Sequence, residues 1–290
     1  THHSQREYDM SKPTSMKVKK FVLSFTDTQI NSKRQVIKKL YGCEEIIANV
    51  AKLTYVPLVD WKEPTCKALN LSSNFISCLY PLAFATNLKT LTIDDNKVPI
   101  YQMIFLNSEN LQTLHCYKNG FQHSDYLSLF LVHSPSSKVD VQLKENQSEQ
   151  LAPSQQKWTD LISLQFLAAF WDQLLAEVLR FSVMDEDEAR KIMWENGVTL
   201  ENLIGWRDKS DSFAQFRRLV RGVAYFMATL QYSWLKGGQQ DAKNTFLRLK
   251  LFQKRKIKRM RLIQFRKMWE EIGFFEFVEC LENEFEFGGE

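Results

Sequence analysis

The chain has 290 residues, which is enough for two ordinary domains with a sizeable core. Hydrophobic residues make up 44% of it and charged residues 25%, a composition that is typical of a folded protein and excludes wholesale disorder. The net charge of +4 is mild, so a basic function must come from local clusters. Because no apolar run approaches the roughly 20 residues that span a bilayer, we expect no membrane association.

The start of the chain and its cysteines indicate an intracellular protein. The first residues include paired histidines and lack the apolar core of a signal peptide, so we interpret residues 1–17 as a tail or the remnant of an expression tag. The cysteines are odd in number and scattered, which does not fit a disulfide framework and favours a reducing compartment. They are Cys43, Cys66, Cys78, Cys116 and Cys280.

A repeated pattern of apolar residues and asparagines follows. The clearest copy reads Leu69-x-Leu71-x-x-Asn74. Because the copies recur at a nearly constant period, they predict stacked strand–turn units, each of which packs against its neighbours. The six predicted strands start at residues 23, 47, 69, 91, 114 and 141, with separations of 24, 22, 22, 23 and 27 residues.

Two physical arguments give the pattern its expected structure. Alternating side chains of a strand point to opposite faces, so Leu69 and Leu71 are predicted to point inward and the residues between them outward. Where the chain leaves each strand, an asparagine amide is suited to pair backbone groups that would otherwise be unsatisfied. We therefore predict an asparagine ladder made of Asn74, Asn96, Asn119 and Asn146.

These copies resemble the leucine-rich-repeat superfamily, in particular its short intracellular type with 22-residue repeats, over residues 18 to about 147. The resemblance implies a small right-handed solenoid with a parallel sheet on its concave side, and a face that binds proteins or protein–RNA assemblies. A solvated sheet face without a partner is the alternative. Carried onto this sequence, the predicted partner-binding residues are Asn70, Ser72, Thr92, Asp94, His115, Tyr117, Gln142 and Lys144.

The second half of the chain changes to a helical period after a polar stretch that contains Pro153. Apolar residues between 161 and 181 form two stripes of one central helix. Asp185 is predicted to cap a second helix that ends at Asn196 and Gly197, and Thr199 to cap a third. The predicted fold class is therefore α/β plus all-α: a leucine-rich-repeat solenoid over residues 18–150, followed by a helical bundle over residues 151–290.

A basic segment at residues 248–267 is the clearest indication of a binding site in that half. Ten of its twenty residues are Lys or Arg and none is acidic. An amphipathic helix with such a face is suited to RNA phosphates, an acidic protein or anionic lipid, and its centre fits a nuclear-import signal. The eight glutamates after residue 269 offer the alternative of internal neutralisation. The predicted nucleic-acid or acidic-partner site is Lys254, Arg255, Lys256, Lys258, Arg259 and Arg261.

The sequence contains no glycine-rich phosphate loop, no H-E-x-x-H or C-x-x-C pair, and no nucleophile placed beside a base. We therefore predict no enzymatic activity, catalytic residue, metal, cofactor or small-molecule substrate. The predicted function is a non-enzymatic intracellular scaffold or adaptor of a multi-protein complex, with the nucleus slightly favoured over the cytoplasm. The alternative is a nuclear ribonucleoprotein component in RNA processing or export, which binds RNA through residues 248–267. A ubiquitin-ligase substrate receptor is a weaker reading, because no recruitment motif is found.

Overall fold

The structure is a computed structural model, and the part of the chain that it describes is made up of eight ranges. These are residues 20–22, 43–50, 52–56, 66–106, 108–119, 121, 124–132 and 138–237. The basic segment 248–267 and its six predicted contact residues, Lys254, Arg255, Lys256, Lys258, Arg259 and Arg261, lie outside these ranges, as does Cys280.

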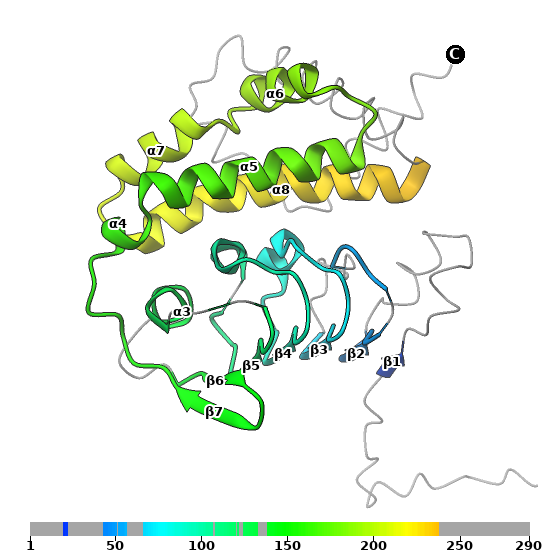
Figure 1. The fold of residues 1–290 in the computed structure, drawn as a ribbon, viewed down its shortest axis with the longest axis vertical. Coiled ribbons are helices and arrows are strands. Elements are labelled where there is room, and N and C mark those ends of the chain that lie inside the picture. Colours follow the sequence, from blue (N-terminus) through cyan, green and yellow to red (C-terminus); the bar gives the residue numbers. More distant parts are fainter. Residues whose placement is uncertain are drawn as a thin grey trace, which may run out of the picture.

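Seven short strands, two 3₁₀ helices and six α-helices follow one another within the described residues (Figure 1). The strands are β1 (Lys20–Val22), β2 (Glu45–Ile47), β3 (Ala68–Asn70), β4 (Thr90–Thr92), β5 (Thr113–His115), β6 (Asp140–Lys144) and β7 (Gln147–Gln150). The 3₁₀ helices are η1 (Tyr80–Phe84) and η2 (Ile100–Phe105). The α-helices are α3 (Ser124–Leu131), α4 (Trp158–Leu161), α5 (Leu164–Phe181), α6 (Glu186–Glu195), α7 (Leu200–Lys209) and α8 (Phe213–Gly237).

All seven strands belong to one mixed sheet, in which they lie in chain order. The pairs from β1 to β6 are parallel, and β7 returns antiparallel to β6. In β2 to β5 the central residue is buried and its two neighbours are half-buried, as expected of a strand with one covered face. The buried central residues lie in one register: Ile46, Leu69, Leu91 and Leu114.

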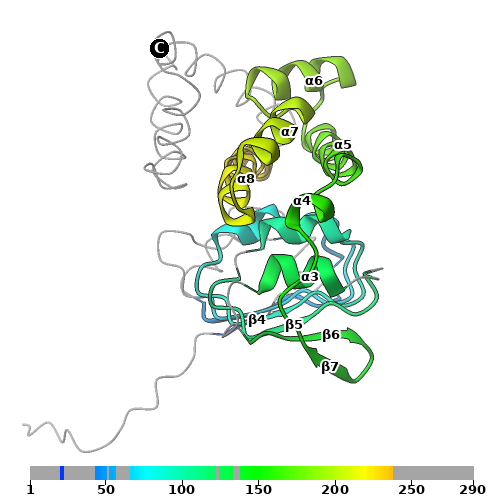
Figure 2. The same cartoon turned by 90° about the vertical axis from the view of Figure 1, so that its left-hand side faces the viewer.

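Further layers cover the inner face of the sheet. The helices η1, η2 and α3 lie directly on it, α5 and α8 lie across them, and α6 and α7 are outermost (Figures 1 and 2). Aromatic rings join the layers: Phe105 of η2 lies 5.2 Å from Phe170 of α5, and Tyr126 of α3 stacks on Phe166 at 5.6 Å between ring centroids. The buried residues form one hydrophobic cluster that runs from Cys43 to Leu230.

The predicted fold class, a leucine-rich-repeat solenoid followed by a helical bundle, is wrong. The structure has an α/β layout in which one mixed sheet and the helices share one continuous core. The repeat pattern stops at β6, where the chain turns back into an antiparallel hairpin. Helix α5 packs on α6, α7 and α8 and also contacts η2, so the helices do not have a core separate from that of the sheet. The domain boundary predicted at residue 150 stays a prediction.

The strands predicted to start at residues 23 and 47 are out of register with the observed β1 and β2. Ile46 of β2 is fully buried, as is Ala48 just after the strand, while Ile47 is half-buried and on the outward face. Likewise, β1 pairs its position 21 with Ile46, two residues before the predicted start at Leu23. A shift of one residue exchanges the two faces of a strand, so the error at Ile47 misassigned the outward side chains of β2.

The asparagine ladder is confirmed for three of its four predicted members. Asn96 Nδ2 donates to the carbonyl oxygens of Leu71 (2.9 Å), Ile93 (3.0 Å) and Asp94 (3.1 Å), and its Oδ1 accepts from the Ile76 N–H (3.0 Å). Each asparagine therefore joins its own turn to the turn of the preceding unit. The equivalent contacts of Asn74 and Asn119 follow the same scheme.

Asn146 does not belong to this ladder. It is exposed and lies in the two-residue turn between β6 and β7, with a φ of 55°. Asparagine tolerates this left-handed conformation better than most residues, which explains why the same residue type occurs at the end of the pattern.

The predicted helix ends in the second half are confirmed. The Asp185 carboxylate accepts from the Glu188 N–H (2.8 Å), and the Thr199 hydroxyl accepts from the Asn202 N–H (3.0 Å). Helix α6 ends at Asn196, and Gly197 follows it with a φ of 73°, in the left-handed region that favours glycine.

Polar side chains also anchor the helices on the inner layer. Buried Gln102 accepts from the Leu79 N–H (2.8 Å) and donates to Gln173 Oε1 of α5 (2.8 Å), and Gln173 donates to the Ser77 carbonyl oxygen (2.6 Å). Nearby, the Glu177 carboxylate is buried but pairs with Arg180 at 2.7 Å. Desolvation outweighs this pairing and raises the pKa of Glu177.

Arg217 makes the largest set of hydrogen bonds between α8 and the inner layer. Its guanidinium is buried and donates to the carbonyl oxygens of Ile104 (3.0 Å), Phe130 (2.8 Å) and Leu106, and to the Ser108 hydroxyl (3.3 Å). Three of these acceptors are backbone carbonyl groups at the carboxyl ends of η2 and α3, where no further helix turn follows to supply N–H donors, so Arg217 supplies them.

We predict that Asn96→Ala lowers the free energy of unfolding by about 2–4 kcal/mol, because several buried backbone groups lose their partner at once. Chemical denaturation at neutral pH measures this change. Asn146→Gly is the matched control: its exposed turn accepts glycine at positive φ, so its stability should stay within about 0.5 kcal/mol of the wild type. Equal losses in both variants would contradict the ladder.

We predict that Arg217→Met destabilises the protein by about 2–4 kcal/mol, because the methionine fills the space but leaves buried carbonyl oxygens unpaired. Arg218→Met, on the exposed side of the same helix turn, should change stability by less than about 0.5 kcal/mol. Thermal and urea denaturation of both variants provide the comparison. A small effect of Arg217→Met would mean that water replaces the guanidinium at little cost.

Candidate functional site

The outward face of the sheet is the candidate site. Helices η1, η2 and α3 lie on one side of the sheet, and on the other side the described part of the chain places no helix (Figures 1 and 2). The strands present half-buried side chains there, because each central residue is directed into the core. The face is therefore held by a packed layer behind it while its own side chains remain accessible.

Strand register brings four of the eight predicted residues into one row. Asn70 of β3 pairs with Thr92 of β4, Thr92 with His115 of β5, and His115 with Gln142 of β6. Neighbouring strands in a sheet are about 4.8 Å apart, so this row presents an amide, a hydroxyl, an imidazole and a second amide over roughly 15 Å. All four are half-buried and face outward.

A second row lies where the chain leaves the same strands, and hydrogen bonds hold its side chains. Asn70 Oδ1 accepts from the backbone N–H (3.0 Å) and the hydroxyl (2.7 Å) of Ser72. One unit further on, Asp94 Oδ1 accepts from the Tyr117 N–H at 2.7 Å. The Lys118 ammonium lies 5.3 Å from the centre of the Tyr117 ring, within the range of a cation–π contact.

Asp94 carries the main electrostatic feature of the face. Partial burial raises the pKa of its carboxyl, while the Tyr117 N–H and the nearby His115 oppose this rise and Asp95 adds to it. Asp94 is thus a carboxylate that its surroundings solvate incompletely. It is suited to a cationic or hydrogen-bond-donating group of a partner.

The remaining predicted residue, Lys144, lies at the edge of the face. It is exposed at the end of β6, where the pairing of β6 with β7 is irregular between Gln142 and Lys144. On the opposite side, Glu45 and Ile47 of β2 lie next to Ala68 and Asn70 and extend the face. The register error at Ile47 hid them: Ile46 and Ala48 have the correct spacing of two, but the equally apolar Ile47 between them obscured it.

A second group of arginines, at the start of α8, was not predicted from the sequence, which indicated a basic binding site only at residues 248–267. Arg217, Arg218 and Arg221 lie on two successive turns of a helix whose other side is apolar. The signal was three cations beside a hydrophobic stripe, but nothing local distinguishes a buried arginine from a solvated one.

A metal site, a reactive thiol and a membrane-spanning helix are other features by which the described residues could indicate a function. Among the described residues no group of three or more His, Cys, Asp or Glu is placed to hold a metal ion. Cys66, Cys78 and Cys116 are buried free thiols, and burial raises the pKa of Cys66 to about 12, so that thiol is not poised as a nucleophile. None of the described helices is both long and apolar enough to cross a membrane.

Comparisons with known proteins leave the family open: no protein-family model matches the chain, and no curated protein shows significant similarity to it.

We predict that the Asp94 carboxyl makes the stability of the face depend on pH. Because its folded-state pKa is raised above the ordinary 3.8, the folded protein holds this proton more tightly. The stability of the wild type relative to Asp94→Asn should therefore be highest below about pH 3.8 and fall as the pH rises through the raised value. Urea denaturation of both proteins from pH 3 to 7 measures the difference.

The asparagine variant retains an oxygen that can accept from the Tyr117 N–H, so this comparison isolates the charge. Asp94→Ala, which loses the acceptor as well, should cost about 1 kcal/mol more than Asp94→Asn at every pH. A stability difference between wild type and Asp94→Asn that grows in favour of the wild type with rising pH would contradict the sign.

Proposed function

We propose that this protein is a non-enzymatic scaffold of a multi-protein complex and binds a protein partner on the outward face of its sheet. The observation that carries this proposal is the row of Asn70, Thr92, His115 and Gln142, aligned by strand pairing on a face that no described helix covers. A binding surface of this kind needs side chains that are already placed, because ordering them on binding would cost affinity.

The chemistry of the face favours a polar partner surface with a few anchoring contacts. Amides, hydroxyls and an imidazole offer both donors and acceptors, while Asp94 offers a poorly solvated carboxylate. Tyr117 is the aromatic of the predicted site, and aromatic side chains are enriched among residues that dominate binding energy. We place the partner's main contact between Asp94 and Tyr117, next to the centre of the row.

The resemblance to the leucine-rich-repeat superfamily and the intracellular, preferentially nuclear, location belong to this proposal. The resemblance is supported by the constant register of the buried strand residues and by the shared hydrogen-bond scheme of Asn74, Asn96 and Asn119. The free thiols of Cys66, Cys78 and Cys116 are compatible with that location. RNA binding through residues 248–267 rests on residues outside the described part of the chain, so it enters only as an outcome of the test.

The test is recovery of partners from cell extract on the immobilised protein, with and without nuclease treatment, followed by variants of the face. We expect at least one protein to be retained after nuclease and to be lost with Thr92→Arg, which places a long cation in the middle of the row. Tyr117→Ala should weaken the same partner at least about tenfold, as expected for an anchoring aromatic. Affinity is then measured with the purified partner by calorimetry.

Glu201→Arg is the control, because it places the same cationic side chain at an exposed position of α7, away from the sheet. It should leave the partner bound. If the partner survives Thr92→Arg, the sheet face is not its binding site. If every partner is lost with nuclease, the ribonucleoprotein alternative replaces the scaffold.

A further inference from the structure

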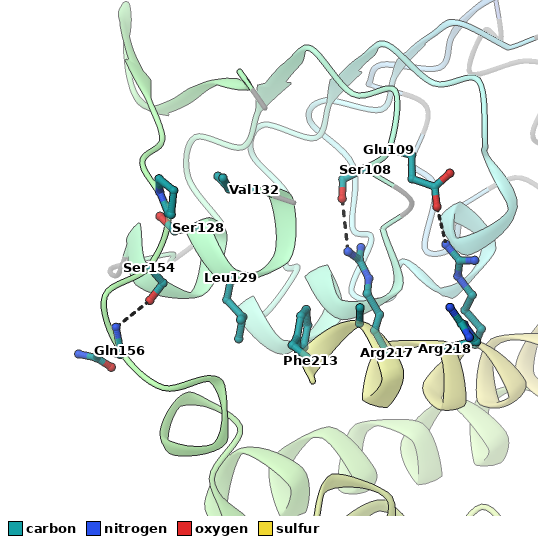
Figure 3. A pocket seen from close by; sticks show the side chains of 13 residues that line it. Ser108, Glu109, Ser128, Leu129, Val132, Ser154, Gln156, Phe213, Arg217 and Arg218 are labelled. Carbon is teal, nitrogen blue, oxygen red and sulfur yellow. Dashed lines mark hydrogen bonds and ion pairs between the residues drawn. The ribbon is translucent and has the colours of Figure 1, made fainter. Parts of the chain in front are cut away.

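A pocket of about 630 Å³ lies on the other side of the sheet from the outward face, between α3 and the start of α8. Its walls come from four segments: the loop after η2, helix α3, the connection from β7 to α4, and α8 (Figure 3). This volume is in the range of small-ligand sites, and neither the sheet face nor its proposed partner uses it.

The pocket has a strong excess of positive charge. Arg217, Arg218 and Arg221 line it against one carboxylate, Glu109, which leaves a formal charge of +2. Arg221 approaches Glu109 only to 3.7 Å, and the side chains are 41% and 66% exposed, so this ion pair is weak. Arg218 has no acidic partner within 4 Å among the residues that the structure describes, and it too is exposed.

Arg217 adds a charge that the protein itself compensates poorly. Its guanidinium is buried and bound to carbonyl oxygens and one hydroxyl, with no carboxylate among these partners. Burial and the like charge of Arg221 lower the pKa of Arg217 to about 9, so the side chain is still cationic at neutral pH. The first turn of α8 contains no acidic residue, so the positive end of the helix dipole adds to the same field.

The opposite side of the pocket is apolar. Leu129 of α3, Val132 just after α3 and Phe213 of α8 line it, and in the view of Figure 3 Leu129 and Phe213 lie between Ser154 and the arginines. A ligand that fills the pocket therefore needs a doubly negative end and an apolar body. At neutral pH a phosphate monoester carries a charge of about −1.5 to −2, whereas a carboxylate carries −1.

We propose that this pocket binds the phosphate of an organic monoester, with the phosphate at Arg218 and Arg221 and an aromatic or aliphatic body against Leu129 and Phe213. Arginine presents paired N–H donors to phosphate oxygens, and the hydroxyls of Ser128 and Ser154 line the same space. Arg217 positions the site by tying α8 to the inner layer. The monoester is either a free small molecule or a phosphorylated side chain of another protein.

Calorimetric titration of the full chain with phenyl phosphate tests the proposal. We expect saturable binding with a Kd of about 1 mM or tighter, and binding of inorganic phosphate and of benzoate at least about tenfold weaker. The double variant Arg218→Gln with Arg221→Gln should weaken phenyl phosphate at least about tenfold. Arg218 is exposed and Arg221 is half-buried with only a weak ion pair, so the melting temperature should remain close to that of the wild type and show that the fold is intact.

The matched control is Arg190→Gln with Lys191→Gln, which removes two exposed charges from α6 and should leave binding unchanged. The source is identified by comparing phenyl phosphate with a short phosphotyrosine peptide. Tighter binding of the peptide supports a phosphorylated protein, and equal or weaker binding supports a free monoester. Absence of saturable binding, or equal binding by the α8 double variant, would overturn the site. Inorganic phosphate as tight as phenyl phosphate would overturn the role of the apolar wall.

Discussion

Pairing of backbone groups where each strand ends is the constraint on which the rest of the structure depends. At these points the chain turns away inside the protein, and water cannot satisfy the peptide groups that the strand leaves behind. Asn74, Asn96 and Asn119 bind peptide groups of two successive units. The residue before each of them takes a left-handed conformation that completes the turn. Because each amide spans two units, it sets the register between them, and the register decides which side chains are buried.

As a consequence, one face of the sheet is covered by helices and the other carries accessible side chains. The inner face receives η1, η2 and α3, and helices α5 and α8 close over that layer. Their junction is not purely apolar: Gln102, Gln173 and Arg217 pair backbone groups that irregular segments leave open. Buried polar groups that are fully paired rigidify a core and favour one arrangement of its layers. The outward face, in contrast, carries side chains already held by the strands and by short local hydrogen bonds.

This division allows two binding sites that do not compete for space. The row from Asn70 to Gln142 lies on one side of the sheet, and the arginine-lined pocket lies beyond the inner layer on the other. The two sites use different chemistry: distributed hydrogen bonding over a broad surface in one, concentrated positive charge in a small cavity in the other. Arg217 has two roles at the second site. It anchors α8 to the inner layer through hydrogen bonds, and its guanidinium adds to the positive charge of the pocket.

The sequence by itself determined the local features. Leu69, Leu91 and Leu114 were predictable as buried strand centres, and the caps at Asp185 and Thr199 as helix starts, because each signal lies within a few residues of its effect. Where the pattern weakened, at Ile47 and Asn146, a one-residue shift of β2 and the β6–β7 hairpin were not predicted. Only the tertiary structure decided that α5 and α8 share the core of the sheet, and that Arg217 is buried while Arg218 remains exposed. The physical reason is that these outcomes depend on contacts between residues about 90 to 115 positions apart, for which one sequence contains no local signal.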